Sequence, residues 1–215
     1  MKHSANIPAY RFQDTLNRAF DIFFSLIGLL LALPVFIFIA GLIWLEDRGA
    51  ILFMQNRIGQ KQKPFKMKKF RTMTEAKNRS SGDIQNDSGQ SLSEQRAEFE
   101  TTSKNDPRIT RVGRFLRPMH LDELPQLLNV LIGDMSLVGV RPDVAVQEVE
   151  YQPQEWIDRH VLRPGITGLA QIDPSVDSMK ARTEQDLRWV SRRNTGLYFK
   201  LLFLTVTKVS KRNSL

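Results

Sequence analysis

The chain has 215 residues, which is enough for one domain with or without a membrane anchor. Lysine and arginine exceed aspartate and glutamate by 31 to 23, so the formal net charge is +8 and an anionic partner is expected: nucleic acid, an anionic lipid surface or a phosphorylated substrate. The absence of cysteine excludes disulfide bonds, thiolate metal sites and cysteine nucleophiles. The scattered histidines His3, His120 and His160 are interpreted as surface or capping residues rather than zinc ligands.

Residues 1–47 are expected to form an N-terminal amphipathic segment followed by a membrane helix. The run from Ile22 to Leu45 contains no charged residue. As a helix it would be about 36 Å long, which exceeds the roughly 30 Å hydrocarbon core of a bilayer. A buried helix of a soluble protein is seldom so uniformly apolar. A cleavable signal peptide fits poorly, because the run is too long and no small-x-small cleavage site follows it.

Pro34 lies in the middle of this apolar run, where it removes a backbone hydrogen bond and bends a helix. Basic residues flank the run on both sides, and basic flanks mark the cytoplasmic side of a membrane. A helix kinked at Pro34 that enters the bilayer and returns would place both ends on that side. A kinked helix that crosses the membrane completely is the alternative. The flanking residues are Lys2, Arg11 and Arg18 before the run and Arg48, Arg57, Lys61, Lys63, Lys66, Lys68, Lys69 and Arg71 after it.

Residues 51–73 are expected to form two short strands around a basic, glycine-containing turn. Apolar residues are interspersed with lysines in the second strand, and Lys69 comes near its end. Two interpretations are open: a cationic hairpin that lies on anionic lipid, or part of a phosphate site. Residues 76–105 are mostly polar and are expected to form a variable, mobile insertion to which we assign no chemistry.

The adjacent acids Asp122 and Glu123 lie at the centre of the most informative stretch. Pro125 suits the first turn of a helix, so the two carboxylates would lie at or just before a helix start, where free backbone N–H groups favour anions. A helix cap and a first-turn acid are the ordinary explanation for such a pair. Arg117 before the pair and Arg141 after it point instead to phosphate chemistry, with acids that attack or bind a metal and arginines that bind phosphate oxygens. The helical apolar spacing comes from Leu124, Leu127, Leu128 and Leu131.

The remaining segments add one candidate residue and two helices. Residues 106–118 are expected to form a helix that begins at an Asp-Pro pair. The segment Arg163 to Ile172, RPGITGLAQI, combines two turns with a short strand and places Arg163 on a turn that faces whatever the loop surrounds. Residues 188–211 combine aromatic and basic residues, as an amphipathic helix in the membrane interface does, and a helix that packs in the core is the alternative.

Taken together, these segments resemble the bacterial sugar transferases, monotopic phosphoglycosyl transferases that begin the assembly of lipid-linked glycans. The resemblance extends from about residue 15 to about residue 207 and rests on four motifs: LPVFI, RIGQKQKPFKMKKFRTM, DPRITRVGRFLRPMHLDELPQLLNVLIGDMSLVGVRPD and RPGITGLAQI. The order KFRTM, LDELPQ, RPGITG is highly specific. The chain looks like the minimal catalytic form, without the multi-spanning N-terminal domain of larger relatives.

The resemblance implies transfer of a sugar 1-phosphate from a nucleotide diphosphosugar, with UDP the expected nucleotide, to undecaprenyl phosphate. This would be the first membrane step of surface glycan or exopolysaccharide assembly. Asp122 matches the nucleophile that forms a covalent phosphosugar intermediate, Glu123 matches its partner, and both are implied ligands of the cofactor Mg²⁺. The helix start and nearby arginines are expected to keep Asp122 ionised. The basic positions implied around the substrate phosphate are Lys69, Arg117, Arg141 and Arg163.

The expected fold is therefore helix-rich α+β, monotopic, with interfacial amphipathic helices and a re-entrant helix kinked at Pro34. A catalytic domain over residues 48–215 would lie on the cytoplasmic face of the bacterial inner membrane. The implied partners are the nucleotide diphosphosugar, undecaprenyl phosphate and the membrane, without nucleic acid, and a homo-oligomer is compatible with the sequence. A membrane-anchored, non-catalytic polyanion-binding or scaffold protein is the alternative. Against polyanion binding, the basic turn lacks interleaved base-stacking aromatics, and the acidic pair would repel phosphates without a metal.

Overall fold

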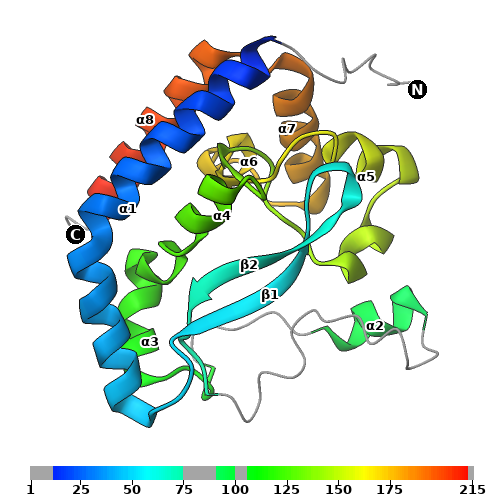
Figure 1. Cartoon of the computed structure of the whole chain (residues 1–215). Coiled ribbons are helices and arrows are strands. Elements are labelled where there is room, and N and C mark those ends of the chain that lie inside the picture. The colour runs from blue at the N-terminus through cyan, green and yellow to red at the C-terminus, as the bar shows by residue number, and fades with distance from the viewer. Residues whose placement is uncertain (1–11, 75–90, 100–105, 213–215) are drawn as a thin grey trace.

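The computed structural model describes residues 12–74, 91–99 and 106–212. The long helix α1 runs along one edge with the C-terminal helix beside it, and the first pair of strands and most of the shorter helices lie to one side of it (Figure 1). The expected helix-rich α+β architecture is confirmed. The helices are α1 (Phe12–Asp47), α2 (Leu92–Glu98), α3 (Arg111–Leu116), α4 (Gln126–Ile132), α5 (Pro153–Arg159), α6 (Leu169–Ile172), α7 (Met179–Arg192) and α8 (Thr195–Arg212), and the strands are β1 (Leu52–Ile58), β2 (Pro64–Phe70), β3 (Ser136–Val138) and β4 (Gly165–Thr167).

Helix α1 is the apolar segment expected from the sequence, and the described part of it begins at Phe12. It contains Pro34, and it changes direction partway along its length (Figure 1). A proline inside a helix accounts for such a bend because it removes one backbone hydrogen bond. Within the described residues, α1 is the one helix long and apolar enough to cross a membrane, with a mean hydropathy of 2.9 over its most apolar window. Most of its apolar side chains face outward, while Ile39 and Ile43 are buried.

Strands β1 and β2 form the antiparallel hairpin predicted for residues 51–73. Their pairing runs from Leu52 opposite Phe70 to Ile58 opposite Pro64. Phe70 is buried at the far end of β2, where its ring lies 5.1 Å from that of Phe36 on α1. The hairpin is thereby fixed to α1, and Lys69 is directed away from Phe70 because neighbouring residues of a strand point to opposite faces.

Strands β3 and β4 form a second, parallel pair, which confirms the short strand predicted within RPGITGLAQI. The backbones of these two segments approach closely at glycines: a Cβ on Gly165 would lie 2.0 Å from the backbone nitrogen of Gly139. A Cβ on Gly168 would lie 2.0 Å from the Gly139 carbonyl oxygen. Glycine is therefore required here because the backbones touch, and the motif supports the loop that begins after β3.

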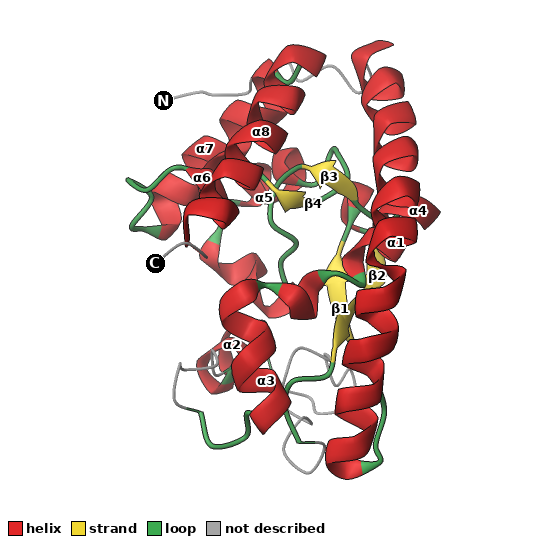
Figure 2. Cartoon of the chain, turned by 90° about the vertical axis from the view of Figure 1, so that its left-hand side faces the viewer, coloured by secondary structure: helices red, strands yellow, loops and turns green. Residues whose placement is uncertain are grey.

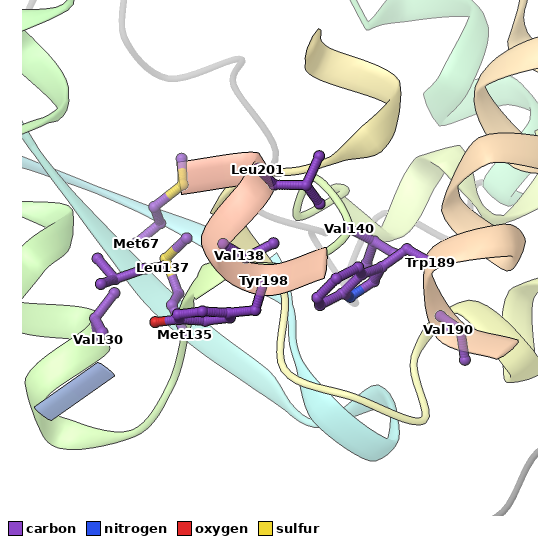
Figure 3. Packing of buried hydrophobic residues seen from close by; sticks show 10 residues of the cluster. All are labelled: Met67, Val130, Met135, Leu137, Val138, Val140, Trp189, Val190, Tyr198 and Leu201. Atoms are coloured by element: carbon purple, nitrogen blue, oxygen red, sulfur yellow. The ribbon is translucent and has the colours of Figure 1, made fainter. Parts of the chain in front are cut away.

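The main hydrophobic core lies between β2, α4, β3, α7 and α8 (Figure 3). Asp21 of α1 is buried beside it and accepts hydrogen bonds from the backbone N–H of Leu137 at 2.9 Å and the hydroxyl of Tyr198 at 2.8 Å. These bonds join α1, β3 and α8. The buried members of the cluster are Met67, Val130, Met135, Leu137, Val138, Val140, Trp189, Val190, Tyr198 and Leu201.

The expectation of one interfacial helix over residues 188–211 is wrong, because two helices share this segment. Helix α7 ends at Arg192, and the side chain of Asn194 accepts a hydrogen bond from the N–H of Leu197 and so starts α8. Trp189 is buried in the core rather than placed at an interface. In helix α8, Tyr198 packs in the core, as the alternative of a core helix predicts, and another face exposes apolar side chains, including Phe203 and Val206. Helix α8 includes residues 210 and 211, so the segment is helical up to its predicted end.

Two other segments differ from the sequence-based expectations. The helix predicted to begin at Asp106–Pro107 begins at Arg111, because Thr110 provides the N-terminal cap and Asp106 instead pairs with Arg108. The polar insertion 76–105 contains helix α2, which starts with a capping box between Ser91 and Glu94. An ion pair between Arg96 and Glu150 fastens α2 to the segment before α5. The remainder of the insertion lies outside the described residues.

His160 is not the surface or capping residue expected, since it is buried. Its Nδ1 lies 2.7 Å from the Trp156 carbonyl oxygen, and its ring lies against the Trp156 ring. Burial lowers the pKa of His160 from 6.5 to about 4. The folded protein therefore holds a neutral imidazole where the unfolded chain would hold a charged one below pH 6.5.

Acid is therefore expected to destabilise the fold through His160. The unfolded chain binds more protons between about pH 4 and pH 6.5, so stability is complete above pH 6.5 and is lost as the pH falls through that window. From pH 7.5 to pH 5 the loss from this residue should be about 2 kcal/mol. Denaturant unfolding in detergent at several pH values would measure it. A His160→Asn variant, which cannot titrate, should lose that part of the pH dependence, and an unchanged slope would contradict the assignment.

Candidate active site

The acidic pair Asp122 and Glu123 lies in a 3₁₀ turn, Leu121–Glu123, immediately before α4. Pro125 caps α4 on its N-terminal side, which confirms the predicted position of the acids just before a helix. The preceding residue, His120, adopts a left-handed conformation with φ of 56°, so the chain reverses between two short turns. Asp122 is 8% exposed, and this tight geometry holds it beneath the surface rather than in solvent.

Lys69 reaches the acids from the end of β2. Its Nζ lies 2.7 Å from Oε1 of Glu123. Arg117 precedes the acids in the preceding turn and is near enough to favour the ionised form of Asp122. Arg141, which is exposed, favours the ionised form of Glu123. Three of the four basic residues predicted from the sequence therefore surround the pair.

The two carboxyl groups have different electrostatic environments. Burial is the strongest influence on Asp122 and raises its pKa, and Lys69 and Arg117 only partly offset it. Burial also opposes ionisation of Glu123, but Lys69 and Arg141 together hold the pKa of Glu123 below its ordinary value. The sequence-based argument for an ionised Asp122 included the cations but omitted this burial. Ionisation is therefore favoured at Glu123, whereas the charge of the neighbouring Asp122 is poorly solvated.

Arg141 is held by its backbone, which leaves its side chain free to face the site. Its carbonyl oxygen accepts a hydrogen bond from the guanidinium of Arg159 at 3.0 Å. The next residue, Pro142, accepts one from Arg57 at 3.0 Å. Beyond it, Asp143 is buried and pairs with Arg159. These partners come from β1 and α5, so two segments distant in sequence fix one loop.

Arg163 is the predicted site residue that the structure places elsewhere. Its Nε donates a hydrogen bond of 2.8 Å to the Gly133 carbonyl oxygen, at the C-terminal end of α4, whereas the acids precede the N-terminal end. Arg18 of α1 binds the neighbouring carbonyl oxygens of Val130 at 2.6 Å and Leu131 at 3.0 Å. Cations favour this negative end of a helix. In this structure Arg163 therefore supports α4 rather than the acidic pair.

Other residues near the acids were not predicted as site residues. Arg57 of β1 lies beside Arg141, and burial together with Arg141 lowers the pKa of Arg57 to about 10. The feature of the sequence that could have identified Arg57 is its place in the basic RIGQ motif. A cavity of about 470 Å³ opens next to Glu123, between α4, β4, α6 and α8. It is lined by His120, Glu123, Leu124, Leu127, Arg141, Ile166, Thr167, Gln171, Ile172, Thr205 and Lys208.

The acidic pair is suited to a metal that also binds substrate. Within the described residues, no group of three or more acids and histidines forms a metal cluster. Mg²⁺ commonly binds through one or two carboxylates together with substrate phosphates and water. Asp122 and Glu123 are adjacent and offer such oxygens, so the residues present fit Mg²⁺ bound jointly with a phosphorylated substrate.

Comparison with known proteins reveals relatives over most of the chain. UDP-glucose:undecaprenyl-phosphate glucose-1-phosphate transferase of Klebsiella pneumoniae is 38% identical over 200 residues, which covers 89% of this chain and 39% of that protein. Exopolysaccharide production protein PSS of Rhizobium leguminosarum bv. phaseoli is 41% identical over 202 residues, which covers 89% of this chain and 93% of that protein. UDP-N-acetylgalactosamine-undecaprenyl-phosphate N-acetylgalactosaminephosphotransferase of Aeromonas hydrophila is 32% identical over 208 residues, which covers 94% of this chain and 44% of that protein.

The match differs in extent from one relative to another. The chain spans about two fifths of the length of the Klebsiella transferase and nearly all of the Rhizobium protein. The description of one family, bacterial sugar transferase, fits residues 12–212, which include α1, the acidic pair and α8. The chain therefore belongs to the bacterial sugar transferase family.

Proposed function

We propose that this protein transfers a sugar 1-phosphate from a UDP-sugar to undecaprenyl phosphate, through a covalent acyl phosphate on Asp122. The observation that carries the proposal is the buried acid beside Glu123, with Lys69, Arg117 and Arg141 around the pair. The relatives support the substrate classes, because their names specify UDP-sugars and undecaprenyl phosphate. The Rhizobium relative supports exopolysaccharide production as the pathway.

In the first half-reaction, a carboxylate oxygen of Asp122 attacks the phosphorus that bears the sugar. An oxygen–phosphorus bond forms to Asp122, the bridging bond of the diphosphate breaks, and UMP leaves with the bonding electrons. Lys69 and Arg141 lower the repulsion between the attacking carboxylate and the diphosphate. In the second half-reaction, a phosphate oxygen of undecaprenyl phosphate attacks the same phosphorus and releases Asp122. The carboxylate is thus regenerated, and one difficult displacement becomes two easier ones.

The remaining residues position these groups. Glu123 holds Lys69 through their ion pair and, together with Asp122, would hold Mg²⁺, which when bound neutralises phosphate charge. Burial of Asp122 weakens hydration of its carboxylate, which favours attack on a neighbouring phosphorus. The nearby membrane helix would keep the site close to a lipid acceptor.

A screen of UDP-sugars tests this function. The protein in detergent or nanodiscs is incubated with Mg²⁺, undecaprenyl phosphate and one UDP-sugar at a time, and UMP is measured. At least one donor should release UMP and yield a lipid diphosphosugar. If no donor releases UMP above a control without protein, while the protein still binds membranes and polyanions, the non-catalytic alternative is favoured.

Arg141→Ala is expected to impair catalysis without unfolding the protein. Loss of one donor to developing phosphate charge typically costs about 3 kcal/mol, or roughly 100-fold in kcat. Folding should persist, because Arg159 and Arg57 hold this loop through backbone oxygens that the substitution keeps. Initial rates and thermal unfolding would measure both effects. Arg188→Ala, at an exposed arginine of α7, is the matched control. Normal turnover by Arg141→Ala would place the phosphate-binding cation elsewhere.

We further propose that α1 enters and leaves the membrane on the cytoplasmic side of the bacterial inner membrane, so that both termini are cytoplasmic. Pro34, the bend in α1 and the two basic flanks support this topology. Residues 48–215 would then form the catalytic domain on that face.

The absence of cysteine makes this topology directly testable. Single Ser4→Cys and Ser214→Cys variants can be treated with a membrane-impermeant maleimide in spheroplasts and in inverted membrane vesicles. Both positions should react in inverted vesicles and be protected in spheroplasts. Labelling of Ser4→Cys in spheroplasts, with Ser214→Cys protected, would instead demonstrate a complete crossing.

A further inference from the structure

We propose that the 470 Å³ cavity beside Glu123 binds the first isoprene units of the polyprenyl phosphate acceptor, with the phosphate at the Arg141 end. This inference rests on the proposed function and assigns one substrate to one part of the site. It is carried by the lining of the cavity, by its position behind the exposed apolar helices, and by the change in chemistry from one end to the other.

Most of the lining of the cavity is apolar, and its charged side chains are Glu123 and Arg141 next to the acidic pair and Lys208 on the α8 side. Leu124 and Leu127 come from the start of α4, and Ile166 and Ile172 come from β4 and α6. Arg141 and Glu123 lie at the junction with a smaller, polar cavity that Lys69 and Arg57 also line. A ligand with an anionic head and a hydrocarbon chain matches this gradient, because each part would meet groups of its own kind.

The cavity lies directly behind the helices that expose apolar side chains. Thr205 of α8 lines it, while Phe203 and Val206 on the same helix are 69% and 68% exposed. Leu127 also lines it, and a Cβ on Gly28 of α1 would lie 3.3 Å from the Leu127 side chain. Figure 2 shows α8 and α1 on either side of the region that contains β4. A lipid chain from the bilayer therefore has a short path into the cavity.

The lining does not suit the nucleoside of the donor equally well. Among the described lining residues none is Phe, Tyr or Trp, and His120 supplies the single ring on which a base could stack. Lys208, the cation at the α8 side, donates hydrogen bonds to the carbonyl oxygens of Gln171 at 3.0 Å and Ile172 at 3.3 Å. It is therefore engaged with α6, which leaves Arg141 to meet the phosphate.

Narrowing the cavity should impair the second half-reaction selectively. Ile172→Trp adds bulk at the α6 wall, and Thr205→Phe adds it from α8. In each variant the KM for undecaprenyl phosphate should rise about tenfold or more. The rate at which the donor alone forms the phosphosugar adduct should stay within about twofold of wild type. Ile157→Trp, at an isoleucine of α5 that is 46% exposed, is the matched control and should change neither quantity.

The opposite pattern would overturn the inference. If the adduct formed more slowly from the donor alone while the KM for undecaprenyl phosphate stayed unchanged, the cavity would bind the nucleotide sugar instead. If neither the rate of adduct formation nor this KM changed, the cavity would bind neither substrate. Thermal unfolding identifies a variant that fails to fold, and because the two substitutions lie on different helices, one suffices for the test.

Photocrosslinking provides a readout that does not depend on turnover. A polyprenyl phosphate with a diazirine on its first isoprene unit should crosslink to peptides that contain residues 124–127 or 166–172. Unlabelled undecaprenyl phosphate should compete, and crosslinks confined to the outer faces of α1 and α8 would contradict the proposal. If the wild type crosslinks as expected but forms no adduct with any UDP-sugar, the proposed function fails while the lipid site stands.

Discussion

Asp122→Asn is expected to abolish turnover and to prevent the mass increase of one sugar phosphate that wild type should show with donor and Mg²⁺ alone. The amide keeps the size of the side chain but is a very poor nucleophile. Removal of a covalent nucleophile typically lowers kcat by roughly 10⁴- to 10⁶-fold. Intact-protein mass spectrometry without the lipid acceptor measures the adduct, and UMP release measures turnover.

The same variant should fold at least as well as wild type. Burial raises the pKa of Asp122, which means that the fold disfavours the charge there, and the neutral amide removes that cost. Asp177→Asn, at an exposed aspartate, is the matched control and should keep full activity. Substantial turnover by Asp122→Asn would end the covalent mechanism. Sequential kinetics and an unmodified wild-type mass, with a productive donor, would leave Asp122 as a metal ligand only.

Arg159→Met is expected to be the most destabilising single change in the chain's buried ion network. Arg159 is 0% exposed and pairs with Asp143 and Asp186, with its Nη2 2.7 Å from an Asp186 carboxylate oxygen. Methionine of similar length would leave both carboxylates buried with less compensation. Breaking a buried pair from one side typically costs about 3–5 kcal/mol. Denaturant unfolding in detergent measures the loss, and UMP release should also fall because the Arg141 carbonyl oxygen loses its partner.

Arg182→Met provides the comparison within the same network. Arg182 also pairs with Asp143, but its side chain is 19% exposed, so solvent can compensate for part of the loss. Its effect should be clearly smaller than that of Arg159→Met. Adding Asp186→Asn to Arg159→Met should restore part of the stability, since one uncompensated charge is removed. Equal stability of Arg159→Met and wild type would show that the network contributes little to folding.

Local patterns in the sequence determined several elements correctly. The uncharged run around Pro34 predicted α1, and the alternation around a basic turn predicted the β1–β2 hairpin. The apolar spacing after Glu123 predicted α4 with the acids just before it. Such features could be derived because helix and strand periodicity, prolines and caps act over a few neighbouring residues. The resemblance to the family supplied the proposed catalytic roles, which spacing alone left open between a helix cap and a catalytic pair.

The break between α7 and α8 was missed although its local signal was present. Asn194 is a favoured helix cap, but the aromatic and basic pattern over residues 188–211 was interpreted as one amphipathic helix. The buried ion pair between Arg193 and Asp14 connects this break to the beginning of α1. Burial of Trp189 likewise depends on β2 and β3, which lie far away in the sequence.

Only the tertiary structure decided which charged residues meet. Lys69 reaches Glu123 across a separation of 54 positions, whereas Arg163, in an equally specific motif, binds the opposite end of α4. Burial of Asp122 also depends on the elements packed around its turn, and it reverses the direction of the pKa shift expected from nearby cations alone. The sequence by itself determined the residue types and the local elements of the site. The packing of distant segments determined the distances and the solvent exposure, and these set how strongly the charges interact.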